Sequence, residues 1–323
     1  MLRSNQLSYT TETGCFKTFV FKPTADAVKP KIIHNFRSHS PQLTHNQSMT
    51  APNTPMPSHF EPSRQAAEIL WSHWQSGQVL ATLPEACRPL TTAQGYAIQA
   101  QWPAVSGRSV VGWKIAATSA NGQAHIQVSG PLAGRLLSGQ MLDSGATVPS
   151  AGNRMRVAEP EFAFVMGQDL TPQGAPRTQE QVMAAVAALH PAIEVPDSRL
   201  EPFAAAGEAQ LLADNACARH FVLGPTAPDL WRSIDLSTYP VHAQVSRNGS
   251  NVYTREGHGG NVLGDPRIAL TWLANQLSDL GITLQKGQVV TTGTCMVPLE
   301  IEPGDTATAD YGPLGRVRMT FEK

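Results

Sequence analysis

The sequence contains few cysteines, and no two of them lie close together. The four cysteines among the 323 residues are Cys15, Cys87, Cys217 and Cys295. None belongs to a C-x-x-C pair, which excludes a zinc-ribbon site and argues against a framework of disulfides. We interpret all four as ordinary thiols of a reducing compartment, and we therefore expect a cytoplasmic protein.

The sequence also lacks long apolar runs, a dominant charge and nucleotide-binding motifs. No window approaches the roughly 18 uninterrupted apolar residues that a membrane helix needs. Charged residues make up 15% of the chain, and the formal net charge is -1. A chain of nearly zero net charge has no strong electrostatic attraction to nucleic acid or to an anionic membrane, and we expect neither as a partner. No G-x-G-x-x-G motif and no P-loop motif supports a nucleotide-binding fold.

Residues 1–58 lack a sustained apolar pattern and are rich in Ser, Thr, Asn and Pro. Their basic residues outnumber the two acids, Glu12 and Asp26, and the segment has no apolar core of a secretory signal. Such a segment cannot bury enough surface to offset its ordering entropy. We interpret it as a disordered leader, or as a start assigned too early with Met49 as the real start. A transit peptide is the alternative.

Helical periodicity and capping residues predict the helices of residues 59–323. The expected helices cover residues 63–75, 91–102, 178–189 and 265–280. Thr178 opens the third with a capping box, because Gln181 follows three residues later. Asp265 serves as N-cap of the fourth, Pro266 takes its first position, and Gly281 ends it. The first two helices make a small helical part at about 61–105 within one domain.

The strands are predicted mainly in the second half of the chain. They cover residues 109–117, 157–166, 288–294, 305–310 and 315–321, with a hairpin at 241–253. The hairpin turns at Asn248-Gly249, a favoured pair for a tight turn. Helices come early and strands come late, without a regular β-α-β alternation. This order predicts an α+β fold rather than a doubly wound sheet.

Glu159 and Glu161 give the strongest local chemical signal. They lie two residues apart in an apolar strand, Ala158 to Val165, so both carboxylates point to one face. Two buried carboxylates repel each other and are costly to desolvate, and a hard divalent cation such as Mg²⁺ relieves both problems. A bare E-x-E pair is also common on solvated edge strands, and this interpretation stays open for the pair alone.

Glu194 and Lys114 place two more charged groups inside apolar runs. Glu194 lies in Pro191 to Asp197, and three carboxylates with water would complete the shell of a Mg²⁺ ion. Lys114 lies in Val110 to Ile115, where burial would lower its pKa and make it a proton donor, a proton acceptor or a carboxylate clamp. An ion-paired glutamate and an edge-strand lysine are the plainer alternatives.

Two polar segments are expected either to line a pocket or to cap nearby elements. Ala213 to Ala216 places Asp and Asn between apolar runs. Thr291 to Thr294 ends a strand with hydroxyls and a glycine, which suits the close approach of a small anionic ligand. The residues alone do not decide between the two roles.

These motifs together resemble the 2-keto-4-pentenoate hydratase and 4-oxalocrotonate decarboxylase group of the fumarylacetoacetate hydrolase superfamily. The resemblance is carried, in order along the chain, by Gly112–Ile115, Thr118-Ser119, Glu159–Glu161, Ile193–Val195, Ala213–Asn215, Val262–Pro266, Trp272–Ala274, Thr292–Thr294 and Pro303–Asp305. It covers roughly residues 61–323, which it implies form a single catalytic domain. It further implies a mixed β-roll or sandwich with flanking helices.

The resemblance also implies the chemistry of the site. Glu159, Glu161 and Glu194 would hold Mg²⁺ or Mn²⁺, and Lys114 matches the active-site lysine of the group. Substrate contacts are expected at three positions, namely Ile115, Thr294 and, with less support, Asn215. The substrate would be a small 2-oxo acid that chelates the ion. Hydration of 2-hydroxypenta-2,4-dienoate to 4-hydroxy-2-oxopentanoate in aromatic catabolism is the expected reaction. Homo-oligomers are expected, with the paralogous decarboxylase or hydratase as a further partner.

One position departs from the pattern of the group. Where relatives often carry an acid in a Pro-Asp-aromatic-Gly stretch, this chain reads Pro131-Leu132-Ala133-Gly134. The proton-handling acid is thus replaced by Leu132, which puts ordinary hydratase activity in question. His125 lies in the region where the hydrolase branch uses a His-Glu pair, but no acid is beside it, and we interpret it as structural. The alternatives are a decarboxylase, an acylpyruvate hydrolase or oxo-acid tautomerase, and a non-catalytic binding or assembly protein.

Overall fold

The computed structural model describes residues 60–323. The leader predicted for residues 1–58 lies outside the described residues, and so does Cys15, so the domain boundary stays a prediction. The α-helices of the described part are α1 (Phe60–Ser76), α2 (Thr92–Gln99), α3 (Trp102–Ser106), α4 (Ala120–Ile126), α5 (Gln179–Ala184), α6 (Glu208–Ala213) and α7 (Pro266–Asp279).

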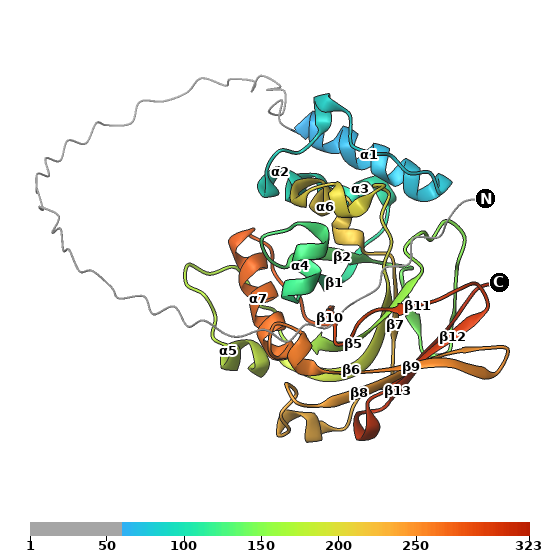
Figure 1. Ribbon diagram of the computed structural model, residues 1–323. Coiled ribbons are helices and arrows are strands. Elements are labelled where there is room, and N and C mark those ends of the chain that lie inside the picture. The colour runs from blue at the N-terminus through green and yellow to red at the C-terminus, as the bar shows by residue number, and fades with distance from the viewer. Residues whose placement is uncertain (1–59) are drawn as a thin grey trace, which may run out of the picture. The chain divides into compact units, whose positions relative to one another are not determined.

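Two sheets run through residues 60–323 (Figure 1). The larger sheet has the order β2 (Leu132–Leu137), β1 (Val110–Ala116), β10 (Val289–Thr294), β5 (Val157–Met166), β6 (Val186–Val195), β7 (His220–Leu223) and β3 (Met141–Asp143), with β11 (Leu299–Glu300) paired to β5. The smaller sheet has the order β4 (Thr147–Val148), β13 (Arg316–Phe321), β12 (Asp305–Asp310), β8 (Pro240–Arg247) and β9 (Ser250–His258). Both parallel and antiparallel pairs occur, which confirms the predicted mixed α+β architecture.

The main core joins the two sheets and α7. Phe162 and Phe164 of β5 point into it together with Met319 of the smaller sheet and Leu273 of α7. Successive strand residues alternate between faces, so Glu159 and Glu161 point to the other face of the large sheet. A smaller cluster that includes Ala163 and Ala192 packs on that other face. The sheet thus separates the core from the face on which the acidic residues lie.

The first helices form a separate cluster at one end of the large sheet (Figure 1). Ala66, Leu70 and Trp102 are buried there, as the helical spacing of residues 63–75 predicts. The rings of Trp71 and Trp74 meet Trp102 edge-on at 5.9 and 6.3 Å between centroids. None of the helices in residues 60–323 combines the length and the apolar character that crossing a membrane requires.

Most capping and turn predictions are confirmed, and two helix ends are wrong. The capping box of Thr178 is present, but α5 ends at Ala184 and residues 186–195 form β6, because pairing with β5 overrides local helix preference. The helix predicted over 91–102 is divided into α2 and α3 before Pro103, whose missing N–H and ring disfavour a continuous helix. Asp265 caps α7 through the backbone N–H of Arg267, as predicted.

The predicted strands are all present, and the hairpin turns where expected. Asn248 and Gly249 take φ angles of 52° and 82°, the left-handed pair that a tight two-residue turn needs. The short strands β3, β4 and β11 are additional to the predicted ones, and so are the longer strands β2 and β7. Both lie beside strands that carry site residues, so their pairing places segments that the sequence pattern leaves unassigned.

Candidate metal centre

The large sheet brings the three predicted glutamates together. Glu159 and Glu194 are direct partners across the antiparallel pair of β5 and β6, and Glu161 follows on the same face. One carboxylate oxygen from each of the three lies within 4.8 Å of the others. Glu161 and Glu194 are buried and Glu159 is half-buried, so the interpretation of a solvated edge-strand pair is wrong.

Strand β10 orients one of these carboxylates. Oε2 of Glu161 accepts hydrogen bonds from the backbone N–H of Gly293, at 2.7 Å, and from the hydroxyl of Thr291. The segment Thr291 to Thr294 therefore contributes side-chain and backbone donors to an acidic residue of the site. Gly293 has a φ of 99°, and an added Cβ would lie 2.1 Å from the hydroxyl oxygen of Thr118. Only glycine allows the backbone N–H to approach Glu161 at this point.

The remaining carboxylate oxygens fit a cation. Within residues 60–323, Oε1 of Glu161 and both oxygens of Glu194 are buried without a hydrogen-bond donor. Burial raises the pKa of all three carboxyls, and the charges of Glu194 and Glu159 raise that of Glu161 further. In their ionised forms they are three negative charges facing one buried ammonium, Lys114. A hard divalent cation would supply both the missing partners and the missing positive charge.

Lys114 lies on the same face of the sheet as the glutamates. Its Nζ is 3.2 Å from Oε2 of Glu194 and donates a 3.0 Å hydrogen bond to the carbonyl of Ala216. Burial lowers the pKa of Lys114, but the nearby carboxylates, Glu194 and Glu159 foremost, outweigh burial and raise the pKa above its ordinary value. The pKa decrease predicted from burial alone is therefore wrong, because the sequence pattern does not show how close the carboxylates are.

The carbonyl that holds Lys114 belongs to an unusual turn. Asn215, Ala216 and Cys217 have φ angles of 55°, 51° and 62°, so three consecutive non-glycine residues are left-handed. Such residues cost on the order of 1 kcal/mol each and persist only where surrounding contacts fix them. The side chain of Asn215 is one such contact, because it binds the backbone of Arg135 in β2 at both ends of its amide.

The predicted substrate contacts lie near this cluster. Thr294 is the register partner of Glu161, and its hydroxyl donates to the carbonyl of Met296 at 2.9 Å. The pairing of β1 with β10 ends at Lys114, so the backbone of Ile115 lies one residue beyond it, while its side chain points into the core. Asn215 is buried with its amide engaged as described. Their contacts with a substrate stay predictions.

Leu132 and His125 differ in their surroundings. Leu132 is the partner of Ala116 in the pair of β1 and β2, and it therefore faces the same side as Lys114. It is buried in an apolar cluster with Ala216 and Cys217, against which Ile126 and Val128 also pack. His125 lies exposed on α4, and its ring meets the ring of Phe203 edge-on at 5.8 Å; its structural role stays a prediction.

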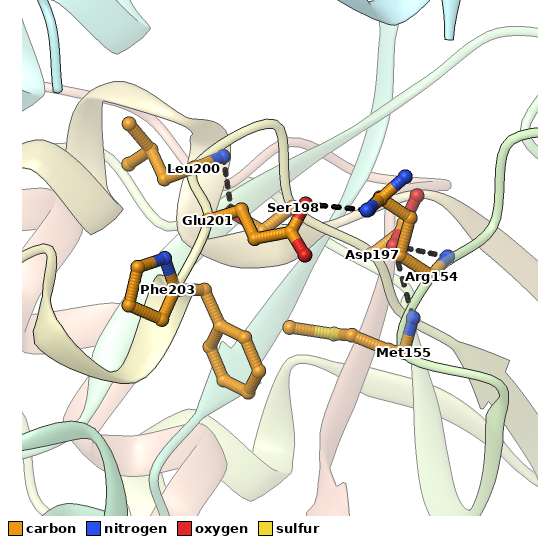
Figure 2. Close-up of a pocket in the computed structure, with 8 residues that line it drawn as sticks. Arg154, Met155, Asp197, Ser198, Leu200, Glu201 and Phe203 are labelled. Atoms are coloured by element: carbon orange, nitrogen blue, oxygen red, sulfur yellow. Dashed lines mark hydrogen bonds and ion pairs between the residues drawn. The ribbon is translucent and has the colours of Figure 1, made fainter. Parts of the chain in front are cut away.

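A cavity of about 240 Å³ opens beyond the strand ends that carry the acids (Figure 2). Its lining includes Asp197, three residues after Glu194, and Met155, which precedes β5. Met155 and Phe203 also pack against the cluster of Leu132, so this apolar cluster borders the cavity. Figure 2 shows the side chain of Met155 pointing towards the ring of Phe203, while the backbone N–H groups of Arg154 and Met155 donate to Asp197.

The structure adds a buried ionic group that the sequence analysis does not identify. Asp197 accepts from the side chains of Arg199 and Arg219, the latter at 2.6 Å, and both guanidinium groups lie over the ring of Trp74. Asp214 accepts from the indole N–H of Trp74 at 3.0 Å. The only local signal for this group is the run of polar residues Asp197, Ser198 and Arg199 after an apolar strand. The residues that complete the group, Trp74, Asp214 and Arg219, are distant in sequence.

Comparison with known proteins identifies the class of this fold and site. Residues 136–322 match the fumarylacetoacetate hydrolase C-terminal family. The chain is 33% identical over 261 residues to a 2-keto-4-pentenoate hydratase of Paraburkholderia xenovorans, covering 80% of this chain and 94% of the relative. The chain therefore belongs to the fumarylacetoacetate hydrolase family, within the group of 2-keto-4-pentenoate hydratases and 4-oxalocrotonate decarboxylases.

Two further relatives show the range of this group. The chain is 31% identical over 247 residues to a 2-oxo-hept-4-ene-1,7-dioate hydratase of Escherichia coli, covering 72% of this chain and 87% of the relative. A solved structure of 4-oxalocrotonate decarboxylase from Pseudomonas putida G7, complexed with magnesium and adipate, is similar with a TM-score of 0.71 and 26% identity. That similarity covers 85% of this chain and 100% of the decarboxylase.

Proposed function

We propose that this protein is a metal-dependent lyase that adds water to a small unsaturated 2-hydroxy or 2-oxo acid. The observation that carries the proposal is the cluster of Glu159, Glu161 and Glu194, buried beside Lys114. Three carboxylates beside a single ammonium are costly to bury unless the site also binds a cation. The relatives named as hydratases support this reaction ahead of others.

The three glutamates are the proposed ligands of Mg²⁺ or Mn²⁺, since oxygen ligands suit both ions. A bound ion of this type would supply electrostatic stabilisation of negative charge on the 2-oxo group. The hydrogen bonds of Thr291 and Gly293 hold Glu161 in place, so one of its oxygens stays directed into the cluster. We infer that the site is oriented before a ligand arrives.

Lys114 is the proposed proton-handling and carboxylate-binding group. Its ammonium lies among carboxylates and is therefore charged, which suits it to attract the anionic end of a 2-oxo acid. In the proposed reaction, 2-hydroxypenta-2,4-dienoate takes up a proton at C5 as its hydroxyl becomes a ketone, and water then adds at C4. The backbone of Ile115 and the hydroxyl of Thr294 are proposed to contact the substrate carboxylate, whereas both ends of the Asn215 amide bind the backbone of Arg135.

The surroundings of Leu132 favour a substrate without a second carboxylate. Leu132, Ile126, Val128, Met155 and Phe203 form an apolar wall on the Lys114 side of the sheet. Desolvating a distal carboxylate against such a wall would be costly. We therefore infer a pentadienoate-like substrate rather than the dioate after which the Escherichia coli relative is named. Because no acid stands at this position, proton transfer would depend on Lys114 or water.

Three alternative functions remain for this site, and the experiment described below distinguishes them from hydration. A 4-oxalocrotonate-type decarboxylase has support from the similar decarboxylase structure. Acylpyruvate hydrolysis or oxo-acid tautomerisation could use the same acidic cluster, and a binding or assembly role would need no turnover. We further propose a cytoplasmic homo-oligomer acting in aromatic catabolism, with a paralogous decarboxylase or hydratase as its partner.

The test is to mix the purified chain with 2-hydroxypenta-2,4-dienoate and follow the loss of its ultraviolet absorbance, first with Mg²⁺ and then with excess EDTA. We expect rapid, EDTA-sensitive loss, with 4-hydroxy-2-oxopentanoate identified as the product by NMR. Mn²⁺ in place of Mg²⁺ compares the two ions directly. Turnover of the heptadienedioate analogue at equal efficiency would contradict the inference drawn from the apolar wall.

The matched variants are Glu159→Gln and, as control, Glu180→Gln on the exposed first turn of α5. The first removes a ligand charge and should abolish turnover and weaken metal binding by at least about 100-fold. The second should change neither. Metal binding without turnover of the dienoate would reject the hydratase and lead to oxalocrotonate and acylpyruvates, whereas no metal binding would reject the metal site itself.

A further inference from the structure

The left-handed turn of Asn215, Ala216 and Cys217 is held from two sides. On one side, the amide of Asn215 accepts from the backbone N–H of Arg135 at 2.7 Å and donates to its carbonyl at 2.8 Å. On the other side, the carbonyl of Cys217 accepts from the backbone N–H of Asp197 at 3.0 Å. The turn therefore bridges β2 to the segment that leaves β6 just after Glu194.

Strand β2 is shaped to admit this turn next to Lys114. Gly134 is the register partner of Lys114 in the pair of β1 and β2. A Cβ added to Gly134 would lie 2.5 Å from the carbonyl oxygen of Asn215 and 3.0 Å from Cγ of Lys114. Glycine weakens a strand interior, and here it allows the backbone of the turn and the lysine side chain to meet.

The middle residue of the turn, Ala216, directs its carbonyl at the ammonium group of Lys114. The carbonyl of Ala216 accepts from Nζ of Lys114 at 3.0 Å, while Glu194 lies 3.2 Å from the same nitrogen. A left-handed conformation at three residues is unfavourable without such support, so these contacts fix the direction of the Ala216 carbonyl. Lys114 has a long and flexible side chain, and the carbonyl of Ala216 gives its ammonium a neutral partner in addition to Glu194.

We propose that Asn215 is a positioning residue: by clamping the left-handed turn to β2, it directs the Ala216 carbonyl at Lys114 and keeps the ammonium at the glutamate cluster. The proposal rests on the proposed function for its effect on turnover, but not for its effect on Lys114. It assigns Asn215 an indirect role and distinguishes that role from direct contact with the substrate.

The first test compares the kinetics of Asn215→Gly and Asn215→Ala with those of the wild-type protein. Both lose the clamp, but only the glycine variant accepts the left-handed φ without strain. Both should lower kcat on the order of 10- to 100-fold, with KM and the Kd for Mg²⁺ within about threefold. The matched controls are the same substitutions at Asn248, which has a φ of 52° in the exposed hairpin turn and should leave all three constants unchanged.

A second measurement needs no turnover. Acetylation of Lys114 by an amine-reactive reagent is followed by mass spectrometry, with exposed Lys286 as internal reference, below the thermal midpoint of each variant. The ratio of the two rates should rise at least about tenfold in Asn215→Gly and not in Asn248→Gly. If the chain proves inactive on the dienoate, this ratio still decides the proposal, so the two failures are distinguishable.

Three results would overturn the proposal. Wild-type kcat and Lys114 protection in Asn215→Gly would show that the clamp is dispensable. A rise in KM with unchanged kcat would show direct contact with the substrate. Should both variants fail to fold, Asn215→Asp retains the acceptor for the Arg135 N–H but replaces the donor to the Arg135 carbonyl by a carboxylate oxygen, and an unchanged Lys114 ratio in that variant would equally reject the clamp.

Discussion

At the scale of single residues, the site depends on how each carboxylate is held. Glu161 uses one oxygen for Thr291 and Gly293 and keeps the other buried and without a donor among the described residues. Glu194 has an ion pair with Lys114 and no hydrogen bond within the same residues. The carboxylate of Glu161 is therefore held by more hydrogen bonds than that of Glu194.

The hydroxyl of Thr291 should matter for metal binding beyond its effect on folding. Thr291→Val keeps the shape of the side chain and removes the donor to Glu161, which should weaken Mn²⁺ binding by about 10- to 100-fold. Thr292→Val is the control, because its hydroxyl is equally buried but donates to the backbone carbonyl of Phe162. Calorimetric titration with Mn²⁺ measures both, and equal losses of affinity would contradict a specific role of Thr291.

At the scale of elements, the antiparallel pair of β5 and β6 forms the ligand set, and other elements hold its surroundings. Helix α1 contributes through Trp74, whose indole N–H donates to buried Asp214 at 3.0 Å. The same carboxylate accepts from the hydroxyl of Ser198 and the backbone N–H of Arg199. Asp214 directly precedes the left-handed turn, so the first helix is connected to the surroundings of Lys114.

Loss of the indole donor should therefore destabilise the fold more than loss of a similar tryptophan. Trp74→Phe leaves a buried oxygen of Asp214 with one donor fewer, and its free energy of unfolding should fall by about 1–3 kcal/mol more than that of Trp71→Phe. Trp71 is the matched control because it also packs edge-on against Trp102. Urea denaturation gives both values, and equal losses would show that Asp214 gains nothing from the indole.

At the scale of the whole molecule, burial makes the fold sensitive to acid at one histidine. His220 lies in β7, its Nδ1 is buried without a partner among residues 60–323, and burial lowers its pKa from 6.5 to about 4, with Arg219 and Arg108 adding to the effect. The unfolded chain therefore binds a proton between these two pH values that the folded chain does not. Stability is present above pH 6.5 and is lost as the pH falls through this window.

The expected loss is up to about 1.4 kcal/mol for each pH unit below 6.5, and it ends near pH 4. His220→Asn should flatten this part of the stability curve, while the same change at exposed His258 should not. Urea denaturation from pH 7 to pH 4 measures the three curves. Parallel curves for wild type and His220→Asn would show that other groups cause the acid sensitivity.

The sequence by itself determined the local features of this protein. Side chains two residues apart on a strand share a face, so Glu159 and Glu161 were predictable as a pair. Asn248-Gly249 and Asp265-Pro266 specify their turn and helix start through backbone conformation and capping, which depend on neighbours in sequence. Glu194 and Lys114 were predictable as site residues for the same reason, because a charged residue inside an apolar run is recognised from its neighbours in sequence.

Only the tertiary structure decided how these features meet. Glu194 lies opposite Glu159 because residues 186–195 pair with β5 instead of continuing α5, and that choice depends on burial against a strand from elsewhere in the chain. The pKa of Lys114 is raised because three carboxylates lie nearby, which no pattern around residue 114 encodes. The left-handed turn at Asn215 likewise depends on contacts with β2, since Ala216 and Cys217 disfavour that backbone.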